Sequence, residues 1–418
     1  MKIPHLRWLI AVALLLAAVL NYIDRNVLGL LATTIQKELH ISDPQYATVL
    51  NFFMVAYTVA YLLSGRVVDR LGVRLSLALF VGWWSVANAL TGCVRSMAGL
   101  CGVRFMLGLG EAGGFTASPK AVSEWFPPSE RGMAVGIYSV GGAIGATVAP
   151  LLVALIAVHY GWRWVFAVSP VLAGLWLILW LWLYRSPAEH PHITDVERAY
   201  LAANIDSPPA ANTAQEPELT LWTRVFRQPL VWQLMLARML TDPVWYFYQF
   251  WMPKYLQSAR GLDQQGVSIM WMIFLAADAG FLLGGFFSGR MIQKGVIPPA
   301  SRLRVMLASA CLVPLSVFVP SMQTVGGVIV IGMLVAYAHT AWLCNLTALV
   351  VDIVPKSILA TAFGVIACGS VLGGIFMNQA VAWLVTHHSY NPCFYLMAAV
   401  HPVAICLIWN LRQRACAI

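Results

Sequence analysis

Long apolar runs separated by short polar turns make up most of this sequence of 418 residues. A helix needs about 20 apolar residues to cross the roughly 30 Å hydrocarbon core of a bilayer, and these runs reach that length. Membrane helices are predicted at residues 8–32, 46–67, 75–94, 97–119, 132–157, 162–184, 229–256, 266–290, 303–320, 324–351, 358–386 and 392–411. The pattern therefore predicts an all-α membrane protein with twelve transmembrane helices.

The longest polar stretch, residues 185–228, divides the predicted helices into two sets of six. It is rich in Pro, Ser and acidic residues, a composition that favours a linker over a third folded domain. We therefore expect a six-helix bundle in residues 1–184, a cytoplasmic linker in residues 185–228 and a second six-helix bundle in residues 229–418.

Composition and charge support the same class of protein. Hydrophobic residues make up 60% of the chain and charged residues 10%, against about 25% charged residues in soluble domains. The net charge of +9 does not indicate a nucleic-acid partner, because the basic residues lie in short loops between apolar runs. Most of them fall on the side that holds both termini, which places the termini in the cytoplasm. The eight cysteines show neither a CxxC pair nor a metal-ligand spacing, so no metal or other cofactor is expected.

An acid and a base stand side by side in the first predicted membrane helix, as Asp24 and Arg25. A charge at this depth costs several kcal/mol, so such a pair indicates a functional site that faces a cavity. The alternative is a buried ion pair that only joins helices. The fourth predicted helix carries a second pair, Arg104 and Glu111, on one helix face because the two residues are seven positions apart. Two such pairs favour a functional role.

Several motifs carry a family resemblance. Residues 65–74, Gly-Arg-Val-Val-Asp-Arg-Leu-Gly-Val-Arg, follow the second predicted helix, and residues 285–292 hold a partial copy in the second half. The first motif resembles the GxxxDRxGxR signature of the major facilitator superfamily. Residues 21–25, 104–114, 125–132 and 241–256 resemble the anion:cation symporter family. The last of these segments, together with residues 276–278, resembles the bacterial hexuronate transporters within that family. The resemblance implies the major facilitator fold and transport of an organic anion.

The resemblance also implies roles that agree with the chemistry of individual residues. An arginine binds carboxylate as a planar fork and keeps its charge, so Arg25 is the candidate for the substrate carboxylate. Asp24 and Glu111 are the candidates for proton coupling, and Arg104 can pair with either acid. Sugar hydroxyls call for polar side chains within apolar helices; the candidates are Tyr57, Gln249 and Asn378, followed by Tyr22, Trp245 and Asn345. For each of these, an interhelical hydrogen bond is the alternative.

A cytoplasmic gate is expected in the loop of residues 65–74, where Asp69, Arg70 and Arg74 would form salt bridges that close this side. The glycines of the fifth predicted helix, at positions 141, 142 and 145, indicate a close-packed surface between the two halves.

Two further acids within predicted membrane helices keep two interpretations each. Asp242 precedes Pro243, so it either caps a kinked helix or acts in the site. Asp278 either binds substrate hydroxyls or holds a helix contact.

Together these features predict a proton-coupled symporter that imports a sugar acid, a hexuronate such as galacturonate or glucuronate, by alternating access. We expect a monomer in the bacterial inner membrane whose partners are an organic anion, protons and lipid, without nucleic acid. No nucleotide-binding loop or nucleophile–base motif indicates an enzyme. The alternatives are a symporter of an aldonate, aldarate or aromatic carboxylate, a facilitator without proton coupling, and a membrane sensor that binds without transport.

Overall fold

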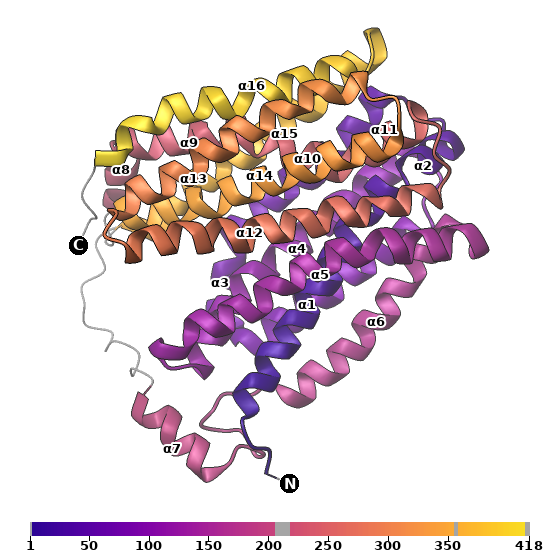
Figure 1. The fold of residues 1–418 in the computed structure, drawn as a ribbon. Coiled ribbons are helices and arrows are strands. Elements are labelled where there is room, and N and C mark those ends of the chain that lie inside the picture. Colours follow the sequence, from indigo (N-terminus) through magenta and orange to yellow (C-terminus); the bar gives the residue numbers. More distant parts are fainter. Residues whose placement is uncertain (1, 205–217, 355–357, 414–418) are drawn as a thin grey trace. The chain divides into compact units, whose positions relative to one another are not determined.

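A computed structural model describes residues 2–204, 218–354 and 358–413 of the chain (Figure 1). These residues are almost entirely helical and contain no β-strand; an isolated bridge joins Ile3 to Ile193. The all-α prediction is therefore confirmed. The chain separates into two compact units: unit 1 holds residues 1–41 and 48–214, and unit 2 holds residues 42–47 and 215–418. Residues 185–204 of the expected linker thus belong to unit 1.

Among the described residues, unit 1 contains the helices α1 (Leu6–Leu30), α2 (Ala32–Leu39), α3 (Asp43–Thr91), α4 (Met97–Trp125), α5 (Pro128–Tyr160), α6 (Trp162–Leu183) and α7 (Asp195–Asn204), except that the start of α3, residues 43–47, is assigned to unit 2. The long helix α3 covers the second and third predicted membrane helices. It is broken at Gly72, whose φ of 72° lies in the left-handed region that glycine adopts without steric cost. Two membrane helices therefore meet at Gly72, as the sequence predicted.

The glycines of α5 allow this helix to pack closely against α1 within unit 1 (Figure 1). A Cβ atom on Gly141 or Gly145 would clash with backbone carbonyls of α1, those of Leu15 and Val19. A Cβ atom on Gly142 would meet the ring of Tyr22. The expectation that this surface lies between the halves was wrong, because its partner is a helix of the same unit.

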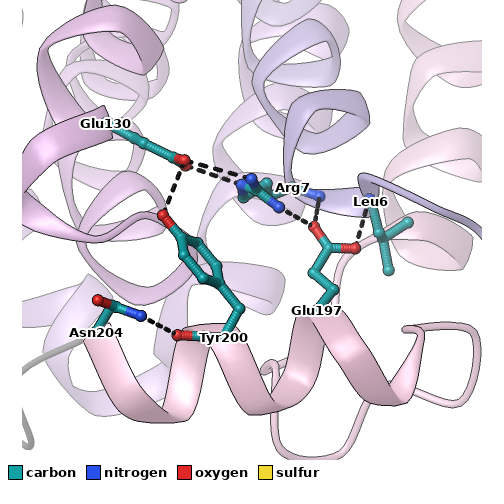
Figure 2. Close-up of polar contacts among 6 residues, drawn as sticks. All are labelled: Leu6, Arg7, Glu130, Glu197, Tyr200 and Asn204. Carbon is teal, nitrogen blue, oxygen red and sulfur yellow. Dashed lines mark hydrogen bonds and ion pairs between the residues drawn. The ribbon is translucent and has the colours of Figure 1, made fainter.

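The linker helix α7 is fixed to the N-terminus of α1 by polar contacts (Figure 2). The N-cap residue of α1, His5, supplies no side-chain hydrogen bond. Instead, Glu197 of α7 accepts hydrogen bonds from the backbone N–H groups of Leu6 (2.9 Å) and Arg7 (3.3 Å). The Arg7 guanidinium bridges Glu197 at 2.7 Å and Glu130 of α5 at 2.9 Å. A residue far along the chain thus satisfies the free N–H groups of α1.

Unit 2 contains the remaining elements: α8 (Glu218–Phe226), α9 (Pro229–Thr241), α10 (Pro243–Phe250), α11 (Met252–Ser258), η1 (Gly266–Ile269), α12 (Met270–Gln293), α13 (Pro298–Leu312), η2 (Val313–Ser321), α14 (Val325–Ile353), α15 (Leu359–His387), α16 (Asn391–Ile408) and η4 (Trp409–Gln413). Within this unit α12 packs against α14, and α9 packs against α15. The core of the unit is apolar and includes Trp342, Leu346 and Ile366.

The seventh predicted membrane helix, residues 229–256, is interrupted twice and forms α9, α10 and α11. The breaks precede Pro243 and Pro253, which lack the N–H group that a continuous helix needs. Irregular backbone at membrane depth is tolerated where it is buried in protein or lines a cavity. The breaks therefore mark α10 as a segment of functional interest.

All twelve predicted spans are helical, and nine helical segments of the described residues are long and apolar enough to cross a membrane. The others correspond to the first half of α3, to α4 and to the three pieces α9–α11. Glycines and the charged residues Arg104 and Glu111 lower the hydropathy of α4, and none of the three short pieces reaches the required length. The chain is a multi-pass membrane protein.

Candidate functional site

Arg25 and Glu111, on α1 and α4, form a buried ion pair in unit 1. The Nε and Nη2 atoms of Arg25 both lie 2.8 Å from Oε2 of Glu111. Glu111 is completely buried, and its second oxygen, Oε1, has no hydrogen-bond partner within the described part of the chain. The structure thus joins the residue expected to bind substrate directly to one of those expected to carry the proton.

Aromatic rings surround the Arg25 guanidinium. Its central carbon lies 4.9 Å from the ring centroid of Tyr57, 5.2 Å from that of Tyr22 and 5.8 Å from that of Phe53. Ring faces attract a desolvated cation and orient its plane. The predicted candidates Tyr22 and Tyr57 therefore lie at the arginine, and Phe53 is a neighbour that the sequence analysis missed.

Asp24 lies in a separate hydrogen-bonded pocket of unit 1. Its Oδ1 atom accepts from Nδ2 of Asn88 at 2.8 Å and from the hydroxyl of Ser169, which lie on α3 and α6. The carboxyl is completely buried, and Oδ2 has no partner among the described residues. Asn88 and Ser169 were not predicted. Their only signal in the sequence is a polar residue within an apolar helix, and that signal does not identify a partner.

Arg104 is also completely buried, and its guanidinium lies 5.4 Å from the ring centroid of Phe53. Arg25 lies at the same ring, so the two guanidinium groups share Phe53 as a neighbour. The close pair described above is formed by Arg25, and the expected pairing of Arg104 with one of the two acids stays a prediction. Two arginines and two acids thus share this buried region, and together they are neutral when both acids are ionised.

The expected gate residues follow α3 through its break at Gly72. Arg70 is exposed, and the side chain of Asp69 lies outside the described residues. Arg74 donates from Nη2 to the backbone carbonyl of Leu181 in α6. The indole of Trp180 donates in turn to the carbonyl of Arg74 at 3.0 Å. Arg74 therefore holds α3 to α6 within unit 1, and a gate remains a prediction.

Four of the predicted substrate residues lie in unit 2. Gln249 of α10 is buried, and its Nε2 has no partner among the described residues. Asn378 of α15 accepts from Nε1 of Trp251 at 3.0 Å. Asn345 of α14 donates to the carbonyl of Gly284 in α12 at 3.0 Å, while its Oδ1 is unpaired in the described chain. The Asn345 amide therefore joins two helices, and Nε2 of Gln249 is an open donor among the described residues.

Trp245 and Tyr246 are neighbours on the short helix α10, but their side chains contact different helices of unit 2. The Trp245 ring stacks on His339 of α14, with centroids 6.2 Å apart and planes inclined by 8°. The Tyr246 hydroxyl lies 3.1 Å from Oγ of Ser370 in α15, a contact that was not predicted. Trp245 thus has a specific packing partner within unit 2.

The sequence left two interpretations each for Asp242 and Asp278, and the structure distinguishes between them only for Asp242. Asp242 stands at the break between α9 and α10, which agrees with the expected kink. Its side chain does not cap α10; Oδ2 accepts from Nε and Nη2 of Arg238, each at 2.8 Å. Asp278 is half-buried on α12 and keeps both of its interpretations.

Known proteins resemble the chain over most of its length. The hexuronate transporter of Escherichia coli K12 is 31% identical over 420 residues, covering 100% of this chain and 96% of that protein. The galacturonate transporter of Dickeya chrysanthemi is 32% identical over 68% of this chain and 82% of that protein. A probable L-galactonate transporter of E. coli K12 is 33% identical over 81% of this chain and 75% of that protein.

Solved structures share the fold at low sequence identity. A bacterial homologue of the human lysosomal transporter Spinster, inward-facing and unoccupied, gives a TM-score of 0.74 at 18% identity and covers 98% of this chain and 95% of its own. A D-xylose–proton symporter gives 0.72 at 15% identity and covers 96% and 97%. Residues 14–345 match the Major Facilitator Superfamily. The chain therefore belongs to the Major Facilitator Superfamily, a family of transporters and not of enzymes.

Proposed function

We propose that the chain is a proton-coupled symporter that imports a sugar acid, most specifically a hexuronate such as galacturonate, by alternating access. The observation that carries this proposal is the buried ion pair of Arg25 and Glu111, whose N–O distances are 2.8 Å. The similar proteins named as hexuronate and galacturonate transporters support the substrate class.

The ion pair suggests how proton and anion are coupled. While Glu111 is ionised, it occupies two of the N–H donors of Arg25. A proton on Glu111 removes the negative charge and weakens that hold, so the guanidinium fork can bind the substrate carboxylate instead. The aromatic rings of Tyr22 and Tyr57 keep the guanidinium in place during the exchange. Proton binding and anion binding then favour each other.

Asp24 has a supporting role in this proposal. It lies next to Arg25 in sequence, and its contacts are with the neutral donors Asn88 and Ser169. A carboxylate that pairs with neutral donors is a second candidate for the coupled proton. The side chains Gln249 and Asn378 of unit 2 would bind hydroxyls of the sugar acid, Gln249 through its unpaired Nε2.

The cellular setting follows from the same proposal. We place the chain in the inner membrane of a bacterium as a monomer, with both termini in the cytoplasm, because the loops on that side hold most of the lysines and arginines. Single cysteines introduced at Lys2 and Glu189 test this orientation, because a reagent that does not cross the membrane should leave both unlabelled in intact spheroplasts. Labelling of both from the outside would contradict it.

The proposed function is tested by uptake of radiolabelled galacturonate into proteoliposomes that contain the purified chain. Accumulation that depends on an inward proton gradient and is abolished by a protonophore is the expected result. Uptake that a protonophore leaves unchanged would indicate a facilitator, and binding without uptake would indicate a sensor. Protein-free liposomes provide the background.

A second substrate class has support of its own, because a probable L-galactonate transporter is 33% identical to the chain. Competition of labelled galacturonate by unlabelled galactonate, glucarate and an aromatic carboxylate separates the classes. If galactonate competes at lower concentrations than galacturonate does, the cargo is an aldonate.

A further inference from the structure

Unit 2 contains a second group of buried titratable side chains, centred on His339 of α14 and His401 of α16. Nδ1 of His339 lies 3.3 Å from Nε2 of His401, and the two rings meet edge to face at 84°. Their exposed fractions are 1% and 0%. Trp245 stacks on His339, and Trp342 packs against His401 with ring centroids 5.1 Å apart. The pair is enclosed by protein and well ordered by its neighbours.

The hydrogen bond between the rings leaves one basic nitrogen open. Two neutral imidazoles carry two N–H groups and two lone pairs, and their contact uses one of each. The remaining nitrogens, Nε2 of His339 and Nδ1 of His401, have no partner within the described chain. Whichever ring donates, one of these two atoms is therefore an unpaired acceptor. A buried acceptor without a donor costs free energy, and a proton would satisfy it.

A counter-charge lies close to the pair. Asp242 stands at the break between α9 and α10, three residues before Trp245, whose ring stacks on His339. Arg238 occupies only Oδ2 of Asp242, and Oδ1 has no partner within the described residues. The ion pair is neutral overall, so a proton on the histidines would add one positive charge to this part of unit 2, and Oδ1 of Asp242 would be the open carboxylate oxygen that stabilises it.

Helix α12 carries one more titratable group, Asp278, close to the part of α14 that holds His339. The hydroxyl of Thr340, the residue after His339, donates to the carbonyl of Ala277, which precedes Asp278. The cluster thus draws on α9, α10, α14 and α16, with α12 packed against α14. Residues on several helices meet here, and their protonation would change how those helices hold together.

We propose that His339 and His401 form a proton-binding site in unit 2, with the Asp242–Arg238 pair as its counter-charge, and that this site takes up a proton together with the substrate anion. The second part rests on the proposed function. The proton comes from water and binds a lone pair of nitrogen, and no covalent bond between heavy atoms changes. Uptake of a positive charge offsets the cost of bringing a carboxylate into the membrane interior.

Proton uptake on ligand binding tests the linkage. Galacturonate is titrated calorimetrically into the full-length chain in nanodiscs, in two buffers that differ in ionisation enthalpy, so that the number of protons bound per anion is measured. His401→Gln keeps an amide that can bond His339 but cannot titrate in this range. It is expected to lower the uptake by up to about one proton per anion, because one titratable site is lost.

The control is His159→Gln, which changes an exposed histidine near the end of α5. It should leave proton uptake unchanged. Wild-type uptake in both His401→Gln and His339→Gln, with unfolding temperatures matching the wild type, would overturn the linkage and leave the pair as a packing contact.

A direct titration separates this proposal from the proposed function. In the wild-type chain labelled with ¹⁵N-histidine, the imidazole signals of the pair are expected to change together in a titration from about pH 8 to 4, a range that extends below that of free histidine. Each Gln variant removes the signals of its own histidine, so the two variants together identify the signals of the pair. If the pair does not protonate over this range, the proton site is wrong even where galacturonate is transported. If the pair protonates but galacturonate neither binds nor moves, the proposed function alone fails.

Discussion

In the proposed mechanism, Arg25 on the membrane helix α1 serves both substrate binding and proton coupling. Its guanidinium contacts one carboxylate at 2.8 Å and lies over the rings of Tyr22, Phe53 and Tyr57. The rings exclude water, and exclusion of water strengthens the ion pair relative to an exposed one. If Arg25 binds the substrate as proposed, the substrate carboxylate has to replace Glu111 at the guanidinium. The proposal therefore ties the affinity for the anion to the protonation of Glu111.

Replacing Arg25 by lysine tests the fork. Arg25→Lys keeps the charge but loses the planar pair of donors, so galacturonate should bind at least about tenfold more weakly. Equilibrium binding to the purified chain measures the change. Arg163→Lys is the matched control, because Arg163 pairs with Glu38 at a partly exposed site. Wild-type affinity in Arg25→Lys would remove Arg25 from the substrate site.

Replacing Glu111 by glutamine tests the coupling. Glu111→Gln has nearly the same shape but cannot gain or lose the proton, so gradient-driven accumulation of galacturonate should stop while exchange of internal for external substrate continues. Both are measured in proteoliposomes. Glu124→Gln, which changes a partly exposed acid of α4 that accepts from Tyr184 at 2.6 Å, should leave accumulation intact. Uphill uptake that survives in Glu111→Gln would exclude this residue as the coupling acid.

At the scale of elements, α7 contacts both the start of α1 and α5. Glu197 caps the N-terminus of α1, Arg7 bridges Glu197 to Glu130, and the Tyr200 hydroxyl donates to Glu130 at 3.1 Å (Figure 2). The caps and ion pairs reinforce one another because they share the carboxylates. The first turn of α1, the helix that carries Asp24 and Arg25, is thereby held by a segment that follows α6.

The buried cap should contribute more stability than the exposed ion pair on the same helix. Glu197→Ala removes the carboxylate that accepts from the backbone N–H groups of Leu6 and Arg7 and leaves the Arg7 guanidinium paired with Glu130, so the free energy of unfolding should fall by about 1–3 kcal/mol. Asp195→Ala is the control, since its pair with Lys2 is exposed and such pairs contribute little. Thermal unfolding of both variants in detergent gives the comparison. Equal shifts in the two would show that the cap does not hold α1.

At the scale of the whole molecule, the apolar pattern predicted the helices well because burial in lipid depends on composition over long windows. The helix expected at residues 324–351 is α14, Val325–Ile353, and the motif glycine Gly72 forms the break within α3. The pairs of side chains that contact each other across helices were less predictable. The sequence indicated that Arg25 and Glu111 are both functional, but not that they pair with each other. The contacts of Glu197 with α1 depend on how distant segments meet, and no local pattern records that.

Alternating access requires the two units to change their relation, so a gate residue should affect the rate of transport more than the binding of substrate. Arg70 is exposed, and Arg70→Ala should leave folding unchanged while it slows galacturonate uptake. Arg74→Ala should behave differently, because this side chain bonds the carbonyl of Leu181 and its loss costs about 1 kcal/mol of stability. Uptake rate, binding affinity and unfolding temperature, measured for both variants, distinguish a gate from a structural contact. If Arg70→Ala lowers uptake and binding in equal proportion, Arg70 acts on the site itself and the proposed gate does not include it.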